Sequence, residues 1–274
     1  MTKAVKYQQK QGRKIFGLVF LVLFIFFKPP AFANDTDDWA GPLRNAQTLL
    51  AKQKYRAALA AFKEQANLDN GLAQFNVALF YDLGWGMSPQ RSIACQWYQK
   101  AAKNNMPGAM QALGQCFFDG QGVEQNKILA YQWFLKAYEQ GIAEGACQAG
   151  ELLLSGDGVD LDVTSGQRLC FQAAQQGAVS AQKKLAQWYF YGQYFPQDYQ
   201  QAFNWLQRVA SVKSPSSAYL LAQFYDQGIG MDVDENQALR WYEVAASGKY
   251  QKAYIPTALL YWQKFTQAKN NKEQ

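Results

Sequence analysis

The chain has 274 residues and contains no histidine. That absence excludes Ser-His-Asp and Cys-His catalysis and histidine-ligated zinc. The formal net charge is +6, but six of the 27 basic residues and none of the 21 acidic residues lie in residues 1–33, so the remainder carries 21 of each. A neutral folded part lacks the basic character of a nucleic-acid-binding domain, and no nucleic-acid partner is expected.

Residues 1–33 have the three parts of a secretory signal peptide. Basic residues between Lys3 and Lys14 precede an apolar run at 15–27, and Ala31 and Ala33 occupy the two positions that a signal peptidase reads. We expect cleavage after Ala33 and export to the periplasm; secretion and an uncleaved membrane anchor are the alternatives. The apolar run is short for an anchor, because a membrane-spanning helix needs about 20 residues. No stable membrane span is expected after cleavage.

Residues 34–72 precede the periodic part of the chain and contain an expected helical hairpin at 41–68. Tyr55, Ala58, Leu59 and Phe62 are spaced as on one face of a helix. This run is similar to the second helix of a tetratricopeptide repeat. We expect the hairpin to cap the N-terminal end of a repeat array.

A spacing of 36 residues dominates the rest of the sequence. It relates the glycines Gly84, Gly120, Gly156, Gly192 and Gly228, and the tryptophans Trp97, Trp133, Trp205 and Trp241, with Leu169 in the missing place. A fixed period of this length is typical of a solenoid of stacked units. The expected units are 73–108, 109–144, 145–180, 181–216 and 217–252.

Each unit has the pattern of a helical hairpin. In the second unit, Leu113 and Phe117 lie on one face of a first helix, and Gly120 ends that helix because glycine adopts the left-handed backbone readily. A capping residue then precedes the second helix. The expected caps are Asn126, Asp162, Asp198 and Asp234.

Two further columns keep their chemistry through the units. The first helices have a small residue at Ala78, Gly114, Gly150, Ala186 and Ala222, and the second helices a larger one at Tyr98, Phe134, Cys170, Leu206 and Tyr242. A small position facing a large one lets two helices interlock. The sequence therefore predicts an all-α fold, a right-handed α-solenoid of antiparallel helical hairpins with a cap at each end.

The pattern in residues 109–141, Ala, Leu-Gly, Phe, Gly-x-Gly-Val, Ala-x-x-Trp-Phe-x-Lys-Ala and Gly, resembles the Sel-1-like repeat, a relative of the tetratricopeptide repeat. Five copies cover 73–252; the third departs at Leu169 and Cys170, and the fourth at Tyr194, which replaces a loop glycine. Exported bacterial members of this family are adaptors in envelope signalling, cell-wall enzyme complexes, flagellar motors and host interaction. The resemblance implies an exported, non-catalytic scaffold that binds a protein partner.

Residues 253–274 follow the last unit. Ala258 and Tyr261 lie one period after Ala222 and Tyr225, so we expect one more first helix, followed by a polar tail from Lys269. A solenoid needs terminal units with a polar outer face to stay soluble. We interpret this helix as the C-terminal cap.

The four cysteines are Cys95, Cys116, Cys147 and Cys170. In an oxidising compartment an even number favours disulfides, and three connectivities exist. Cys95 and Cys116 fall on consecutive antiparallel helices, about equally far from the loop between them, and Cys147 and Cys170 do the same. These are the favoured pairs; a buried thiol is the alternative at Cys116. No CxxC spacing is present, and neither a metal site nor a cofactor is expected.

Three short motifs could carry chemistry, and each has a structural interpretation. The Gly-x-Gly loops lack the context of a phosphate-binding loop and are interpreted as helix ends. Asp157, Asp160 and Asp162 lack the spacing of an EF-hand, and Asp162 is interpreted as a cap. Ser180 and Lys183 match the S-x-x-K motif of penicillin-recognising enzymes without the accompanying motifs, and Ser180 is expected to cap a helix.

Some cysteine-rich Sel-1-like relatives are described as binding or hydrolysing β-lactams. A β-lactam- or peptidoglycan-binding or hydrolysing enzyme is therefore the alternative function, and peptidoglycan is an alternative ligand.

In tetratricopeptide-type arrays the first helices line a groove in which partners lie, and the resemblance implies the same here. The expected partner-binding residues are Phe75, Gln111, Gln115, Phe118, Glu151, Lys183, Gln187, Phe190, Tyr191, Tyr194, Tyr219 and Gln223. The fourth unit has more aromatic residues than its core columns require, which favours an exposed cluster that binds a peptide or protein loop. Contact between adjacent loops is the alternative.

Overall fold

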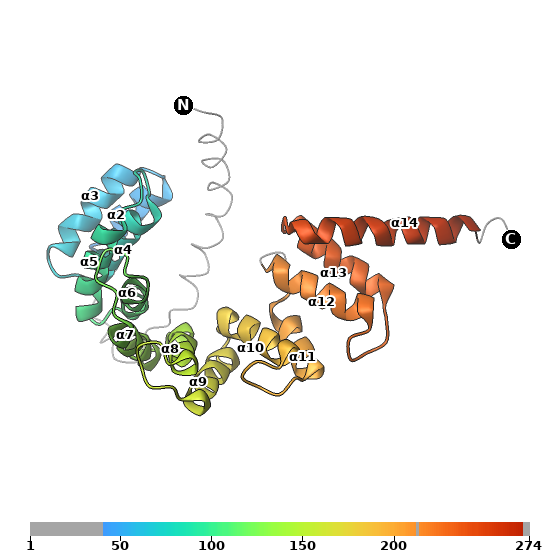
Figure 1. Cartoon of the computed structure of the whole chain (residues 1–274). Helices are drawn as coiled ribbons and strands as arrows, with labels where there is room; N and C mark the ends of the chain where they lie inside the picture. The colour runs from blue at the N-terminus through green and yellow to red at the C-terminus, as the bar shows by residue number, and fades with distance from the viewer. Residues whose placement is uncertain (1–40, 212–213, 271–274) are drawn as a thin grey trace.

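The computed structural model describes residues 41–211 and 214–270, and every regular element in them is a helix (Figure 1). The expected signal peptide at 1–33 lies outside these residues, as does the end of the polar tail. The N-terminal hairpin consists of α2 (Arg44–Ala51) and α3 (Tyr55–Ala66). A short 3-10 helix (Gln251–Ala253) leads into the last helix, α14 (Tyr254–Asn270).

Five hairpins lie between these ends, each made of a first and a second helix. The first helices are α4 (Gly71–Leu83), α6 (Pro107–Asp119), α8 (Ala143–Ser155), α10 (Val179–Tyr191) and α12 (Pro215–Gln227). The second helices are α5 (Arg91–Lys103), α7 (Lys127–Glu139), α9 (Val163–Gln175), α11 (Tyr199–Val209) and α13 (Glu235–Ser247). No helix among the described residues is both long enough and apolar enough to span a bilayer.

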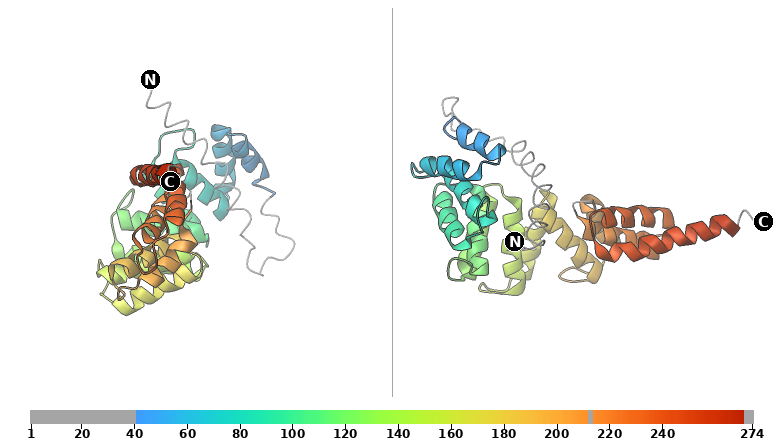
Figure 2. Two further views of the ribbon diagram at one scale, coloured as in Figure 1. Left: turned by 90° about the vertical axis from the view of Figure 1, so that its right-hand side faces the viewer. Right: turned by 90° about the horizontal axis from the view of Figure 1, so that it is seen from above.

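The hairpins stack in chain order into a curved array, with α2 and α3 at one end and α14 at the other (Figures 1 and 2). Each helix packs mainly against the helix before it and the helix after it. The first helices α6, α8 and α10 lie along the inside of the curve, and α7, α9 and α11 along the outside (Figure 1). The prediction of an all-α solenoid of helical hairpins is confirmed.

The helices begin and end where the period predicted. The glycines that follow the five first helices, Gly84, Gly120, Gly156, Gly192 and Gly228, have φ between 63° and 69°. The side chains of Asn126, Asp162, Asp198 and Asp234 accept backbone N–H groups at the starts of α7, α9, α11 and α13. Tyr194 keeps the left-handed backbone of the glycine it replaces, with φ 60°, which costs an L-residue about 1 kcal/mol.

Small residues on the first helices face large ones on the second helices. A Cβ atom on Gly114 would lie 2.6 Å from Cδ1 of Phe134, and one on Gly150 would lie 2.7 Å from the carbonyl oxygen of Gly166. A Cβ atom on Gly166 would in turn lie 2.7 Å from the carbonyl oxygen of Gly150. The contact between α8 and α9 therefore has a glycine on each helix. In the contact between α6 and α7, Gly114 instead makes room for the ring of Phe134.

The C-terminal helix α14 differs from the expected cap. Leu260 is buried in a cluster with residues of α12 and α13. Ile255, Leu259 and Trp262 are exposed. The outer face of this helix is thus apolar, whereas a cap was expected to have a polar one.

Candidate functional site

Two disulfides hold the first helices of the second and third repeats. Cys95 of α5 is bonded to Cys116 of α6, and Cys147 of α8 is bonded to Cys170 of α9, which are the favoured pairs. All four residues are buried. The first bridge joins two successive repeats and the second lies within one repeat. With sequence separations of 21 and 23, each bridge stabilises the fold by about 3 kcal/mol in the chain-entropy estimate.

A chain of hydrogen bonds connects these two first helices. Nε2 of Gln111 donates to Oε1 of Gln148 at 3.0 Å, and Nε2 of Gln148 donates to Oε1 of Gln115 at 3.1 Å. Nε2 of Gln115 in turn donates to Oδ1 of Asp119 at 2.9 Å. Gln148 of α8 is thus held between two glutamines one turn apart on α6, which fixes the orientation of all three amides.

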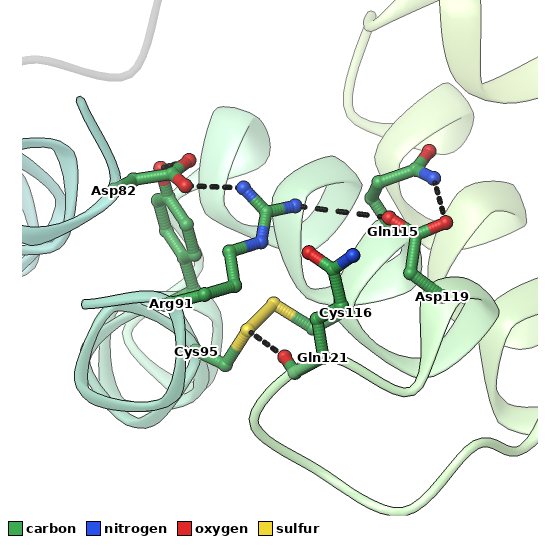
Figure 3. The surroundings of a disulfide bond; sticks show 8 residues. Asp82, Arg91, Cys95, Gln115, Cys116, Asp119 and Gln121 are labelled. Atoms are coloured by element: carbon green, nitrogen blue, oxygen red, sulfur yellow. Dashed lines mark hydrogen bonds and ion pairs between the residues drawn. A yellow bond between two sulfur atoms is a disulfide. The ribbon is translucent and has the colours of Figure 1, made fainter. Parts of the chain in front are cut away.

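The chain of bonds continues into a charged cluster beside the first disulfide (Figure 3). Arg91 at the start of α5 forms an ion pair with Asp82 of α4 and lies 4.0 Å from a carboxylate oxygen of Asp119. The hydroxyl of Tyr98 donates to the other oxygen of Asp82 at 2.9 Å. Burial raises the pKa of Tyr98 well above its ordinary value, and the charge of Asp82 raises it further. The tyrosine therefore stays a hydrogen-bond donor, and Arg91 links the first helices of two repeats.

The same tyrosine–aspartate contact recurs in the last repeat. The hydroxyl of Tyr242 donates to Asp226 at 2.9 Å, and burial followed by this hydrogen bond raises the pKa of Tyr242. Asp82 and Asp226 occupy the column in which the middle repeats have Phe118, Leu154 and Phe190. The first and last repeats thus use a hydrogen bond where the middle repeats use apolar contact.

A second bridge between first helices lies one repeat further along. Nζ of Lys184 on α10 forms an ion pair with Oε1 of Glu151 on α8. This pair and the Gln115–Gln148 pair occupy equivalent positions, each separated by 33 residues. One repeat before the glutamine pair, the equivalent positions hold Leu79 and Ala112. One repeat after the ion pair, they hold Gln187 and Leu220. We call Gln111, Gln115, Gln148, Glu151 and Lys184 the polar row.

The structure brings three of the predicted partner-binding residues together in the polar row: Gln111, Gln115 and Glu151. Lys183 is half-buried beside the row, whereas its neighbour Lys184 makes the ion pair. Gln187 is exposed and Gln223 half-buried on the first helices that follow. The predicted polar residues thus lie on successive first helices, and those in the polar row are joined through Gln148 and Lys184, which were not predicted.

Four of the predicted aromatic residues pack within the array. The ring of Phe75 lies 5.8 Å from that of Tyr98, and the ring of Tyr219 lies 5.5 Å from that of Tyr242. The other two contact a neighbouring helix in the same way. Phe118 lies 6.5 Å from Phe134, and Phe190 lies 5.5 Å from Phe224.

The aromatic cluster of the fourth repeat is mostly internal. The ring of Tyr194 lies 5.1 Å from that of Trp188, and the ring of Phe195 lies 4.9 Å from that of Tyr189. Tyr191 is the exception, because 68% of it is exposed while the edge of its ring contacts Phe190. The exposed part of the cluster is therefore a single tyrosine at the C-terminal end of α10.

Sequence reasoning missed Asp82, Arg91, Asp119, Gln148 and Lys184. A usable signal was present in the pairs Gln115–Gln148 and Glu151–Lys184, which have complementary chemistry at a separation of 33 residues. That separation is three residues shorter than the period. The partner on the next first helix therefore lies almost one helical turn before the position equivalent to the first residue.

The alternative chemical motifs have other roles in the structure. Ser180 is the second residue of α10, and the N-cap is Ala178, so the expectation that Ser180 caps the helix is wrong. Asp162 caps α9 by accepting from the backbone N–H of Ser165 at 2.9 Å, which lowers its pKa. Asp157 forms an ion pair with Lys127 at 3.3 Å. These contacts occupy two of the three aspartates considered for calcium.

A cavity of about 450 Å³ lies on the second helices. Its lining is Phe171, Gln175, Gln201, Asn204, Trp205, Gln207 and Arg208. The guanidinium of Arg208 lies 4.6 Å from the ring centre of Trp205, which is itself buried. The lining contains amides and a guanidinium but no carboxylate, thiol or hydroxyl, so it offers neither a nucleophile nor a general base for hydrolysis.

Comparison with known proteins adds a family and three structural relatives. The sequence model of the Sel1 repeat matches residues 71–106, 107–142, 143–177, 179–211 and 215–250. A Sel1 repeat protein from Oxalobacter formigenes is 27% identical with a TM-score of 0.69, over 77% of this chain and 86% of that one. No curated protein matches the sequence.

Two less similar structures share the fold alone. The protective antigen c5321 of uropathogenic Escherichia coli, which displays an SLR fold, has a TM-score of 0.63 at 24% identity, over 81% of this chain and 49% of that one. The immunity protein Pa5087 from Pseudomonas aeruginosa has a TM-score of 0.51 at 19% identity, over 78% of this chain and 81% of that one.

Proposed function

Because the chain belongs to the Sel1 repeat family, we propose that it is an exported scaffold of the bacterial envelope that binds a protein partner along α6, α8 and α10. Sel1 repeats form scaffolds for protein interaction. The observation that carries the proposed binding surface is the polar row, which joins three successive first helices on the inside of the curve (Figure 1).

The chemistry of this surface indicates the kind of partner. A glutamine amide offers two donors and two acceptor positions, which exceeds what the bonds within the polar row use. The nearby charges are balanced, with three of each sign: Arg91, Lys183 and Lys184, and Asp82, Asp119 and Glu151. A surface of fixed amides and balanced charge suits an extended peptide or a protein loop, whose backbone presents both donors and acceptors.

Export is supported by two independent features. Residues 1–33 have the pattern of a signal peptide. The structure pairs all four cysteines in two buried disulfides, and disulfides persist in oxidising compartments such as the periplasm. A scaffold in that compartment would meet envelope proteins, which is where we propose that its partner lies.

The proposed surface can be tested by site-specific photo-crosslinking in intact cells. Gln115→p-benzoylphenylalanine places the crosslinker on α6 in the polar row, and Gln132→p-benzoylphenylalanine places it on the exposed side of α7, on the outside of the curve. We expect one discrete crosslinked product from position 115 and much less of it from position 132.

The same product should weaken when Glu151→Gln and Lys184→Gln are combined with the crosslinker at position 115, because they remove the ion pair of the row. Both side chains are partly exposed, so the fold should tolerate this change. Equal products from positions 115 and 132, or a product that the pair of changes leaves untouched, would show that the partner does not bind along α6, α8 and α10.

A further inference from the structure

The last helix, α14, exposes an unusual number of large apolar side chains. Leu260 and Ala253 are buried. Two positions along an α-helix differ by about 200°, so Trp262 lies on the opposite side of α14 from Leu260. Trp262 is 64% exposed and Ile255 is 72% exposed. The exposed large apolar residues of the helix are Tyr254, Ile255, Leu259, Tyr261, Trp262 and Phe265. A contiguous exposed apolar face of this kind marks a site of protein contact.

The complete repeats show what normally covers this face. Tyr254 and Ala258 lie 36 residues after Ala218 and Ala222 of α12. Ala218 and Ala222 are fully buried, in a cluster with Ala238 and Tyr242 of the second helix α13. The corresponding position 258 on α14 is exposed and Tyr254 is 48% exposed, because no described helix follows α14. The bare face is therefore the one onto which a second helix packs in the preceding repeats.

We propose that α14 of a second copy of this chain covers this face, so that two molecules associate through an antiparallel pair of α14 helices. The exposed residues Tyr254, Ala258, Tyr261 and Phe265 alternate by four, three and four positions, which is the spacing of a coiled-coil seam. In an antiparallel pair with its two-fold axis between positions 259 and 260, Ala258 lies opposite Tyr261 of the second copy. Tyr254 then lies opposite Phe265 of the second copy.

This register reproduces the packing rule of the repeats. Within each repeat a small residue of the first helix faces a large residue of the second, as Ala222 does with Tyr242. The face of α14 contains both members of such a pair, Ala258 and Tyr261, one turn apart. It is thus complementary to itself when reversed, which is what an interface with two-fold symmetry requires.

The charges on α14 also permit the pairing. The helix carries Lys264 and Lys269 and no acidic residue. Lys264 contacts Asn236 at the start of α13, which holds it on the side away from Trp262. In the antiparallel register Lys264 lies opposite Ile255 of the second copy, and Lys269 lies beyond its first turn. A parallel pair would instead bring like charges at positions 264 and 269 together.

The association state of the purified protein tests the proposal. Light scattering coupled to size-exclusion chromatography should give twice the mass of a single chain. Phe265→Glu should weaken the dimer about 30-fold, because it places a charge in the seam, where Phe265 is desolvated against Tyr254 of the second copy. Gln263→Glu, an exposed neighbour with the same change in charge, should leave the dimer intact.

Cysteine cross-linking tests the register. The native cysteines are paired and buried and do not compete. A mixture of separately tagged Ala258→Cys and Tyr261→Cys proteins should form a mixed disulfide dimer more readily than either protein alone. A monomeric mass in concentrated solution, a dimer that Phe265→Glu leaves intact, or preferential cross-linking of Ala258→Cys to itself would each overturn the proposal. The monomeric mass is also the result expected if a different protein covered α14.

Discussion

Gly114 gives the most quantitative test of the packing between first and second helices. In Gly114→Ala the new Cβ would lie 2.6 Å from Cδ1 and 2.7 Å from Cε1 of Phe134, whereas an ordinary contact is 3.4–4 Å. The ring of Phe134 is buried and cannot swing into solvent. Overpacking of this kind costs about 1–3 kcal/mol, and replacing glycine within a helix returns about 0.5–1 kcal/mol. We expect a net loss of about 1–2 kcal/mol in the free energy of unfolding.

Urea and thermal unfolding followed by far-UV circular dichroism measure this loss, which corresponds to a fall in melting temperature of about 2–8 °C. Gly108→Ala on the same helix is the matched control, because its Cβ would meet only the tip of the Phe75 ring, at 3.1 Å. The fourth repeat supplies the compensating change, since it has Ala186 and Leu206 at the two positions. Adding Phe134→Leu should therefore make the double variant more stable than the sum of the single effects by about 1 kcal/mol or more. Additive effects, or a Gly114→Ala variant as stable as the parent, would refute the assigned contact.

Four further outcomes are expected. Cys95→Ser with Cys116→Ser should lower the free energy of unfolding by about 3 kcal/mol, measured by urea denaturation; a loss below about 1 kcal/mol would contradict the bridging role. Burial and Asp82 raise the pKa of Tyr98 above 10.0, so near pH 10 the unfolded chain releases the phenolic proton while the folded chain keeps it. The free energy of unfolding therefore falls as the pH rises further. Tyr98→Phe should reduce that fall by at most about 1.4 kcal/mol per pH unit between urea titrations at about pH 9 and about pH 11; an unchanged slope would contradict it. The protein isolated from the periplasm should begin at Asn34 by intact-mass spectrometry, and a retained N-terminus would instead favour the anchor. A chromogenic β-lactam should not be turned over, and turnover abolished by Ser180→Ala would restore the enzymatic alternative.

The helix boundaries were predictable because local backbone rules determine them. Gly120 ends α6 and Asp162 begins α9 through contacts within four residues of each site. The contact of Gly114 with Phe134 was also within reach, since the period repeats it five times with different residues. Information of this kind is present in each unit and does not depend on how the units stack.

The polar row was not predictable in the same way. Whether Gln148 meets Gln115 depends on how far one first helix is shifted along the next, and the period of the sequence does not contain that shift. The aromatic residues show the same dependence. The column of Phe118 and Phe190 is one helical turn from the column of Gln115, yet it points at neighbouring helices, because the helices of the array approach on that side. Exposure in a solenoid is thus decided by stacking geometry, and only Tyr191 of this group combines its predicted position with large exposure.

The pair of equivalent positions between successive first helices changes its chemistry along the array. It holds Leu79 with Ala112, then Gln115 with Gln148, then Glu151 with Lys184, and then Gln187 with Leu220. Hairpins of the same kind stack on both sides of every one of these pairs, so the fold does not require one particular pair. A position that folding leaves free is one that binding can specify. The change from apolar to amide to ionic contact along α4, α6, α8 and α10 is thus the feature that a partner lying along these helices would recognise, and exchanging the Gln115–Gln148 pair with the Glu151–Lys184 pair should alter the partner and leave the fold unchanged.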